Sequence, residues 1–271
     1  NGISLFFLIN RVRMDDKIII YTCLTGNYDM LREPSVINEQ FRYIYFSPTK
    51  ITNEFSVWEY RELKDETLDN IELSRLYKIK PHLIFPNNKY CLYIDANMQI
   101  TDANIYDYLI NLASKGAKWV GINHAVRDCI YEEGHAVVIS RKAKYFKVKA
   151  YLKQQMAIGF PAHFGMTENN IIFRNIQDNV VRSICDQWWN LFVDSKTKRD
   201  QLCLPVIFWK NKFQPEYFFG GRRSWNHKGI ERYVHSKDIQ HSKIQKLLKE
   251  IRKWGGYYMN RLLFVLFGPI K

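Results

Sequence analysis

The sequence lacks any pair of cysteines at the spacing of a metal knuckle or a redox motif. Its five cysteines are odd in number and widely scattered, which argues against a disulfide framework or a structural zinc site and favours a reducing cytoplasm. Internal repeats and low-complexity tracts are also missing. The apolar run over residues 3–9 is too short to span a bilayer, and it has neither the basic start nor the cleavage site of a signal peptide.

Acidic residues are scarce relative to basic ones. The chain has 27 Asp and Glu against 40 Lys and Arg, which gives a formal net charge of +13. The excess lies after residue 220, whereas the first half of the chain is nearly balanced. A basic tail on a near-neutral body indicates surface anchoring rather than a nucleic-acid groove. Because no helix-turn-helix, RRM or zinc-finger pattern is present, no nucleic-acid partner is expected.

Patterns typical of strands and helices alternate along the chain. Apolar, β-branched runs predict strands at residues 17–24, 41–46, 55–60, 90–94, 119–122 and 170–174. Helical spacing predicts helices at residues 69–85, 105–113, 142–156, 179–192 and 199–209. This order predicts a mostly parallel, Rossmann-like α/β sheet flanked by helices. We expect a leader over residues 1–13, a single domain over residues 14–240 and a basic amphipathic helical tail over residues 241–271.

One predicted strand, residues 90–94, runs directly into Asp95-Ala96-Asn97. The carboxyl end of a strand in an open α/β sheet lies in the crevice where ligands bind. Asn97 can face the same way as Asp95, and two oxygen ligands of this kind suit Mg²⁺ or Mn²⁺ shared with a diphosphate. Asp and Asn are also common in ordinary turns. The spacing alone therefore leaves both interpretations open.

Five blocks, taken in order, resemble a known family. They are Tyr21-Thr22 with Gly26-Asn27-Tyr28-Asp29, then Asp95-Ala96-Asn97, then Asn123-His124 with residues 127–133, then residues 165–170, and finally Arg199-Asp200-Gln201. With residues 74–93, which precede the second block, they resemble GT-A glycosyltransferases. More closely, they resemble the plant and bacterial glycosyltransferase-like domain named after the TOD and MUCI proteins. The resemblance covers residues 17–209, and five ordered blocks are more specific than any one of them.

This resemblance implies a GT-A-like fold and a sugar transfer reaction. The donor would be a nucleotide diphosphate sugar, and the acceptor a hydroxyl of a glycan or glycolipid in surface polysaccharide or glycolipid synthesis. The nucleoside would be bound by Thr22, Asn27 and Asp29. The donor sugar would be contacted by Asp200 and Gln201, and Asp200 can at the same time cap the helix that it opens.

The metal implied by the resemblance is Mn²⁺ or Mg²⁺, bound by Asp95 and Asn97. An amide is a weaker metal ligand than a carboxylate, so an aspartate at position 97 is expected to preserve or tighten binding of the ion. The third ligand is expected among the late histidines His227, His235 and His241, of which we favour His227.

Ionisable residues in and between the blocks are candidates for substrate binding. Arg75 and Lys78 lie about one helical turn apart on one face, where they either approach the diphosphate or remain solvated surface charges. The acceptor is expected near His124 and Arg127, with Glu132 as the candidate general base.

Glu132 and its neighbour Glu133 are expected on extended backbone, where only one of the two can face the site. In the fourth block, Glu168 and Asn169 are expected to contact substrate.

The C-terminal stretch, residues 243–271, mixes basic residues with Trp254, Tyr257, Tyr258 and a final apolar run. Such an amphipathic helix suits the interface of an anionic membrane, although an apolar stripe can equally pack on the domain or on an oligomer partner. The expected location is therefore the cytoplasm, with peripheral attachment to the inner face of the membrane.

Two other functions stay open. A hydrolase of a lipid amide would use the cluster from His124 to Glu133, although the chain has neither a GxSxG elbow nor an HExxH helix. A non-catalytic module that binds a membrane or a polyanion would use the basic tail, with Asn97 marking a degenerate metal site.

Overall fold

The computed structural model describes residues 17–26, 29–51, 55–224, 227–234 and 243–268. The expected leader, the nucleoside candidate Asn27 and the alternative metal ligands His235 and His241 lie outside these ranges. The expected boundaries of the domain and the tail stay predictions.

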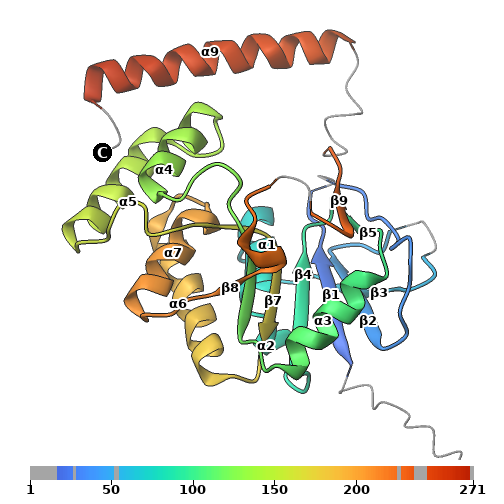
Figure 1. Ribbon diagram of the computed structural model, residues 1–271. Coiled ribbons are helices and arrows are strands. Elements are labelled where there is room, and N and C mark those ends of the chain that lie inside the picture. The colour runs from blue at the N-terminus through green and yellow to red at the C-terminus, as the bar shows by residue number, and fades with distance from the viewer. Residues whose placement is uncertain (1–16, 27–28, 52–54, 225–226, 235–242, 269–271) are drawn as a thin grey trace, which may run out of the picture.

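The fold is built on a seven-stranded sheet with the strand order β3-β2-β1-β4-β7-β6-β8 (Figure 1). Strands β3, β2, β1 and β4 are parallel, β7 runs antiparallel to both β4 and β6, and β8 is parallel to β6. The strands are β1 Ile18–Cys23, β2 Phe41–Ser47, β3 Trp58–Glu62, β4 Tyr90–Ile94, β6 Trp119–Asn123, β7 Thr167–Asn175 and β8 Glu216–Tyr217. The predicted mostly parallel α/β sheet flanked by helices is confirmed.

A small antiparallel ribbon accompanies the main sheet. Its strands are β5 Met98–Ile100 and β9 Ile230–Arg232, with Ile100 opposite Ile230. The ribbon joins the chain just after β4 to a segment more than a hundred residues later. It therefore lies beside the edge at which β4 ends.

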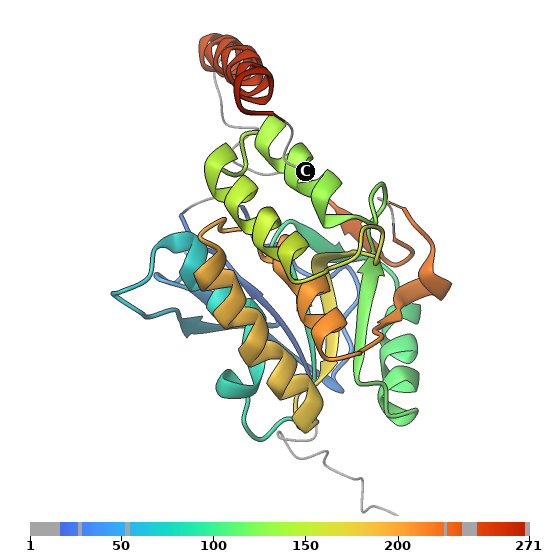
Figure 2. The ribbon, with the colours of Figure 1, turned by 90° about the vertical axis from the view of Figure 1, so that its left-hand side faces the viewer.

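Helices cover both faces of the sheet (Figures 1 and 2). The helices are α1 Asn70–Ile79, α2 Pro81–Ile84, α3 Asn104–Ser114, α4 Ile130–Ile139, α5 Tyr145–Ala157, α6 Asn179–Ser195, α7 Asp200–Lys210, the 3-10 turn η2 Phe218–Gly221, and α9 Lys243–Phe267. Of these, α9 lies beyond α4 and not on the sheet. Alternate residues of β1 divide between two apolar clusters: Tyr21 packs with the α6 and α7 side, and Ile20 with the α3 side.

Two local expectations differ from the structure. The helix expected over residues 69–85 is split, because Pro81 cannot continue the hydrogen-bond ladder of α1 and instead begins α2. The segment expected to be extended around Glu132 is helical, since both Glu132 and Glu133 lie in the first turn of α4. These two side chains still diverge, but by the rotation of a helix and not by the pleat of a strand.

Helix α9 packs its C-terminal half on α4 and α5. The Asn260 amide donates to the Val138 carbonyl oxygen at 2.6 Å, and the Phe264 ring lies 4.5 Å from that of His135 and 5.3 Å from that of Tyr145. One face of this helix therefore packs on the domain, which is one of the two interpretations given for its apolar stripe. Within the described residues, no helix has the length and apolar character that a membrane crossing requires.

Candidate functional site

A buried group of charges lies at the edge of the sheet where β1 and β4 end. Strand β7 begins at this same edge because it runs in the opposite direction, and the Asp95 N–H donates to the Asn170 carbonyl oxygen at 2.8 Å. The first four residues of β7, Thr167 to Asn170, are polar and buried. Buried polar side chains need hydrogen-bond partners, and α7 supplies one of them here, the Asp200 carboxylate, to the Asn169 amide.

Asp200, the first residue of α7, is the centre of this group and is only 3% exposed. Its Oδ1 accepts from Arg75 Nε at 2.9 Å, and its Oδ2 lies 3.1 Å from Lys78 Nζ and 3.3 Å from the Asn169 amide nitrogen. Arg75 and Lys78 both come from α1, where a spacing of three residues places them on one face. The alternative of solvated surface charges is wrong for this pair, because the Lys78 side chain is 3% and the Arg75 side chain 23% exposed.

The charges within this group fix one another's ionisation. Burial alone would raise the pKa of Asp200, but Lys78 and Arg75 outweigh it and hold that pKa well below its ordinary value. Burial lowers the pKa of Lys78, and the carboxylates Asp200 and Asp95 oppose the shift. Two cations against the one buried carboxylate leave an excess positive charge beside Asp95.

Asp95 is the carboxylate of this group that solvent reaches. Its side chain is 36% exposed, and Oδ1 lies 3.8 Å from Lys78 Nζ and accepts from the Tyr93 hydroxyl at 2.8 Å. Burial, followed by the charge of Asp95, raises the pKa of Tyr93 well above its ordinary value, so the hydroxyl remains a donor. The sequence placed Asp95 at the end of a buried strand, and the structure does the same.

Asn97 is held by Tyr233, the residue directly after β9. Its side-chain amide donates to the Tyr233 carbonyl oxygen at 2.8 Å, and the Tyr233 N–H donates to the Asn97 carbonyl oxygen at 2.8 Å. Only the side-chain oxygen of Asn97 is left to bind a metal. An aspartate would replace the donor with a carboxylate facing a carbonyl oxygen, so the expectation that it preserves or tightens metal binding loses its physical basis.

His227 lies toward the other end of the ribbon. It forms an isolated bridge with Ile230, and Ile230 is opposite Ile100, three residues beyond Asn97, which corresponds to about 10 Å along a strand. Its ring stacks on Phe219 at 6.1 Å, and its Nε2 is buried without a hydrogen-bond partner among the described residues. Burial, followed by the charge of Arg232, lowers the pKa of His227.

The donor set therefore fits a metal ion only in part. Across the described ranges, no group of three or more His, Cys, Asp and Glu side chains is arranged to hold a metal. Asp95 and Asn97 offer two oxygen ligands, which suits a hard ion that takes its other ligands from substrate phosphates and water.

A second polar cluster forms around Glu133 rather than Glu132. Glu133 is 4% exposed, and its Oε2 accepts from Arg127 Nε at 2.5 Å and lies 3.7 Å from His124 Nε2. His124 Nδ1 accepts from the N–H groups of Val126 and Arg127. Burial lowers the pKa of His124, with Glu133 opposing the shift. The structure thus brings His124 and Arg127 together as expected, whereas Glu132 is exposed on the outside of α4.

Glu168 is the second residue of β7 and is paired with Ile122 of β6. It is 7% exposed and accepts from the Asn170 amide at 3.2 Å. Burial raises the pKa of Glu168, and Arg232 partly offsets this.

The remaining candidates for substrate binding and catalysis are Thr22, Asp29 and Gln201, on β1, on the loop after it and at the start of α7. Thr22 is fully buried in β1, and its hydroxyl has no hydrogen-bond partner within the described residues. Asp29 is partly exposed on the loop after β1. Gln201 donates to the Thr167 carbonyl oxygen at 3.2 Å, which fixes the start of α7 to the start of β7.

Arg174 was not singled out from the sequence. It is fully buried in β7 and donates to the carbonyl oxygens of Lys78 and Ile79 and to the Tyr21 hydroxyl. It thereby fixes the end of α1 that carries Lys78. The signal in the sequence was an arginine directly after the apolar residues 171–173, at the end of the expected strand, since an arginine is almost never fully buried unless it is paired.

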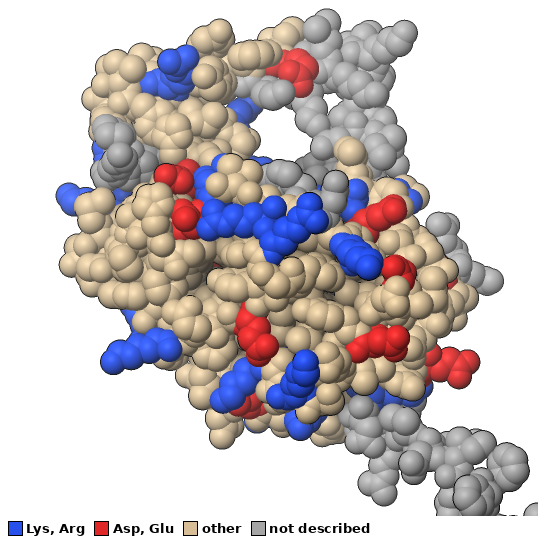
Figure 3. All heavy atoms as spheres, viewed as in Figure 1, with Lys and Arg blue, Asp and Glu red and all other residues tan. Residues whose placement is uncertain are grey.

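Basic side chains also gather on the surface near this edge of the sheet. Figure 3 shows a band of Lys and Arg across the upper part of the body, below α9. Such a band favours the approach of an anion.

The chain was compared with known families and solved structures. The family model for the TOD1/MUCI70 glycosyltransferase-like domain matches residues 47–220, and the resemblance seen in the sequence blocks is confirmed. A solved apo structure of WbbM, a bifunctional glycosyltransferase, is similar with a TM-score of 0.45 and 11% identity over 76% of this chain, and the match covers 39% of that protein. Among curated proteins, none matches the sequence. The chain belongs to the TOD1/MUCI70 glycosyltransferase-like domain family.

Proposed function

We propose that the chain transfers a sugar from a nucleotide diphosphate sugar to an acceptor hydroxyl of a glycan or glycolipid, in surface polysaccharide or glycolipid synthesis. The observation that carries the proposal is the exposed carboxylate of Asp95 beside the buried group formed by Arg75, Lys78 and Asp200. The two cations and the one buried carboxylate leave a positive charge at the edge where α/β sheets bind ligands. A departing diphosphate would be stabilised there.

Each residue of this site has a physical role in such a transfer. Lys78 faces Asp200 and Asp95 at once, so it is placed to interact with the charge that develops on the leaving diphosphate. Asp200 and Asn169 orient that cation and contact the donor sugar, together with Gln201. A bound Mn²⁺ or Mg²⁺ would be held by Asp95 and the Asn97 side-chain oxygen, where it would neutralise phosphate charge.

The acceptor is assigned to the other polar residues at this edge. His124, Arg127 and Glu133 form a ready-made hydrogen-bonding group. The raised pKa of Glu168 suits a carboxylate that accepts a proton from a hydroxyl. No observation favours the lipid-amide hydrolase, since Cys129, the thiol nearest in sequence to this group, is only 3% exposed.

The direct test is a donor screen with the full chain. We expect one nucleotide diphosphate sugar to release its nucleoside diphosphate slowly in water and faster with a glycan acceptor, because the site stabilises the leaving diphosphate. Nucleotide release is measured with and without Mn²⁺, and the matching nucleoside diphosphate should raise the melting temperature. If no donor is turned over and no nucleoside diphosphate stabilises the protein, the proposed transferase activity is wrong.

We also propose that α9 attaches the chain to an anionic membrane surface. Its exposed apolar side chains recur every three or four residues, along the face turned away from α4: Ile251, Trp254, Tyr258, Leu262 and Val265. Such a row is one face of a helix. Basic residues in the same helix supply attraction to anionic lipids, and this attraction supports attachment to the inner face of the membrane.

Replacing Trp254, Leu262 and Val265 together by glutamine should release the protein from vesicles that contain phosphatidylserine. The helix and its contacts with α4 should remain, because none of the three side chains belongs to the packed face. Co-sedimentation at low and high salt measures binding, and donor hydrolysis serves as the control for an intact site. Continued pelleting of the triple variant with the vesicles would show that this face is not the anchor.

A further inference from the structure

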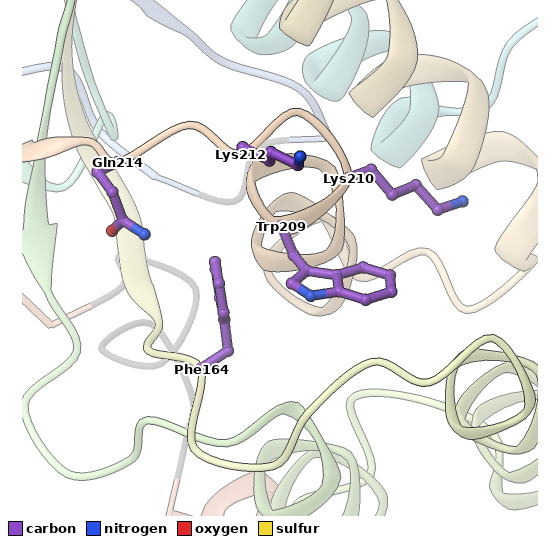
Figure 4. Close-up of a pocket in the computed structure, with 5 residues that line it drawn as sticks. All are labelled: Phe164, Trp209, Lys210, Lys212 and Gln214. Carbon is purple, nitrogen blue, oxygen red and sulfur yellow. The ribbon is translucent and has the colours of Figure 1, made fainter.

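A pocket of about 560 Å³ lies at the far end of α7 from Asp200. It is lined by Phe164, Trp209, Lys210, Lys212 and Gln214. Figure 4 shows the Trp209 ring on α7 and the Phe164 ring on the loop before β7, with the Gln214 amide and the two lysines around them. A volume of this size is within the range of sites that bind small molecules.

Both aromatic rings of the pocket pack against a third ring, that of Phe160. Phe160 packs edge-on against Trp209, with 5.6 Å between the ring centroids, and its centroid also lies 5.6 Å from that of Phe164. The backbone of Phe160 is tied in turn, because its carbonyl oxygen accepts from the Tyr131 hydroxyl at 2.7 Å. Both exposed rings are therefore ordered before any ligand arrives, which lowers the entropic cost of binding.

The lining combines aromatic rings with hydrogen-bond donors. Two partly exposed aromatic faces stand beside an amide and two ammonium groups, and none of the five lining side chains is a carboxylate. A pyranose ring has an apolar face of C–H groups that packs on an aromatic ring. Its hydroxyls accept hydrogen bonds from amide and ammonium donors.

We infer that this pocket is a second sugar-binding subsite, which holds a ring of the acceptor glycan at a distance from the reacting centre. The inference rests on the proposed transferase function. Helix α7 connects the two places: from Asp200 to Lys210 it spans roughly 15 Å at the usual rise. Phe164 lies three residues before Thr167, where β7 enters the site. The subsite therefore contacts a part of the glycan several sugars away from the attacking hydroxyl.

Binding is tested first without any donor, by ¹⁹F NMR of protein labelled with 5-fluorotryptophan. Loss of one signal in the Trp209→Phe variant assigns that residue among the seven tryptophans. We expect cellopentaose, mannopentaose or an acidic hyaluronan tetrasaccharide to shift the Trp209 signal and leave that of Trp189 unmoved. No shift with any of the three, or a shift that inorganic phosphate alone reproduces, would overturn the subsite.

Kinetics then separate the subsite from the reacting centre. Trp209→Ala should raise KM for the long acceptor about tenfold, the equivalent of one lost stacking contact, with donor hydrolysis in water unchanged. Gln214→Ala, at an exposed position, should raise KM in the same direction and covers the case in which Trp209→Ala does not fold. Trp189→Ala, a partly buried tryptophan on α6 outside the pocket, is the matched control. An unchanged KM in both pocket variants contradicts the inference.

The binding experiment and the kinetic experiment together also distinguish this inference from the proposed function. Oligosaccharide binding is measured without catalysis, so it can succeed or fail whether or not the wild-type chain turns over a donor. If the wild type hydrolyses a donor and no oligosaccharide reaches Trp209, only the subsite is wrong.

Discussion

Replacing Asp200 by asparagine is expected to abolish sugar transfer and to lower the free energy of unfolding by about 3–5 kcal/mol. The physical reason is the burial of its partners. Arg75 and Lys78 would keep their charges beside a neutral amide, with the Lys78 side chain 3% exposed and the Arg75 side chain 23% exposed. Urea unfolding measures the stability, and nucleotide release at a temperature where the variant is folded measures the activity.

Asp186→Asn on α6 is the matched control. Its carboxylate also pairs with two basic side chains, Lys80 at 2.8 Å and His82 at 3.3 Å, but it is 48% exposed. Exposed ion pairs contribute little, so the stability should change by less than about 1 kcal/mol. A folded Asp200→Asn variant with wild-type turnover would remove Asp200 from the proposed donor site.

The double variant Asp200→Asn with Lys78→Gln tests whether the stability loss comes from uncompensated charge. Removing the cation as well as the carboxylate should recover part of the free energy of unfolding, because less charge is left buried without a partner. Turnover should not return, since both groups belong to the proposed site. Recovery of turnover in the double variant would mean that the charges serve the fold alone.

How far the sequence predicted this site depends on the distance between partners along the chain. The strand before Asp95 and the shared face of Arg75 and Lys78 follow from local periodicity, and both are confirmed. The pairing of Arg75 with Asp200 crosses 125 positions. No local pattern encodes it, although the family blocks had brought Asp200 to attention.

Two expectations differ from the structure, that of an extended segment at Glu132 and that of tighter metal binding with an aspartate at position 97, and both differences have local physical causes. An extended segment would turn only one of Glu132 and Glu133 toward the site, whereas the chain enters α4 at Ile130 and the helical rotation turns Glu133 inward. Asn97 was judged as a metal ligand by its chemistry alone. Its partner, Tyr233, directly follows β9, a strand of only three residues, which is too short to give a periodic signal.

Asp95→Asn is expected to reduce turnover about 100-fold or more while leaving the stability nearly unchanged. The amide keeps an oxygen for the Tyr93 hydroxyl, and Lys78 remains paired with Asp200 at 3.1 Å, so the buried group survives intact. What is lost is the exposed negative charge that would share a divalent ion with the diphosphate, and one missing electrostatic contact of this kind costs on the order of 100-fold. Nucleotide release is measured against Mn²⁺ concentration, with urea unfolding in parallel.

The two carboxylates are thereby assigned different tasks, although they lie on either side of one lysine. Asp200 should affect both stability and turnover, because it is buried and pairs with two cations. Asp95 should affect turnover alone, because its side chain is 36% exposed and faces the solvent-accessible edge of the sheet. Asp95→Ala should add a stability loss of about 1–3 kcal/mol, the cost of leaving the Tyr93 hydroxyl without its acceptor. If Asp95→Asn instead keeps wild-type turnover and its Mn²⁺ dependence, the diphosphate is bound elsewhere, and the basic band below α9 becomes the place to look for it.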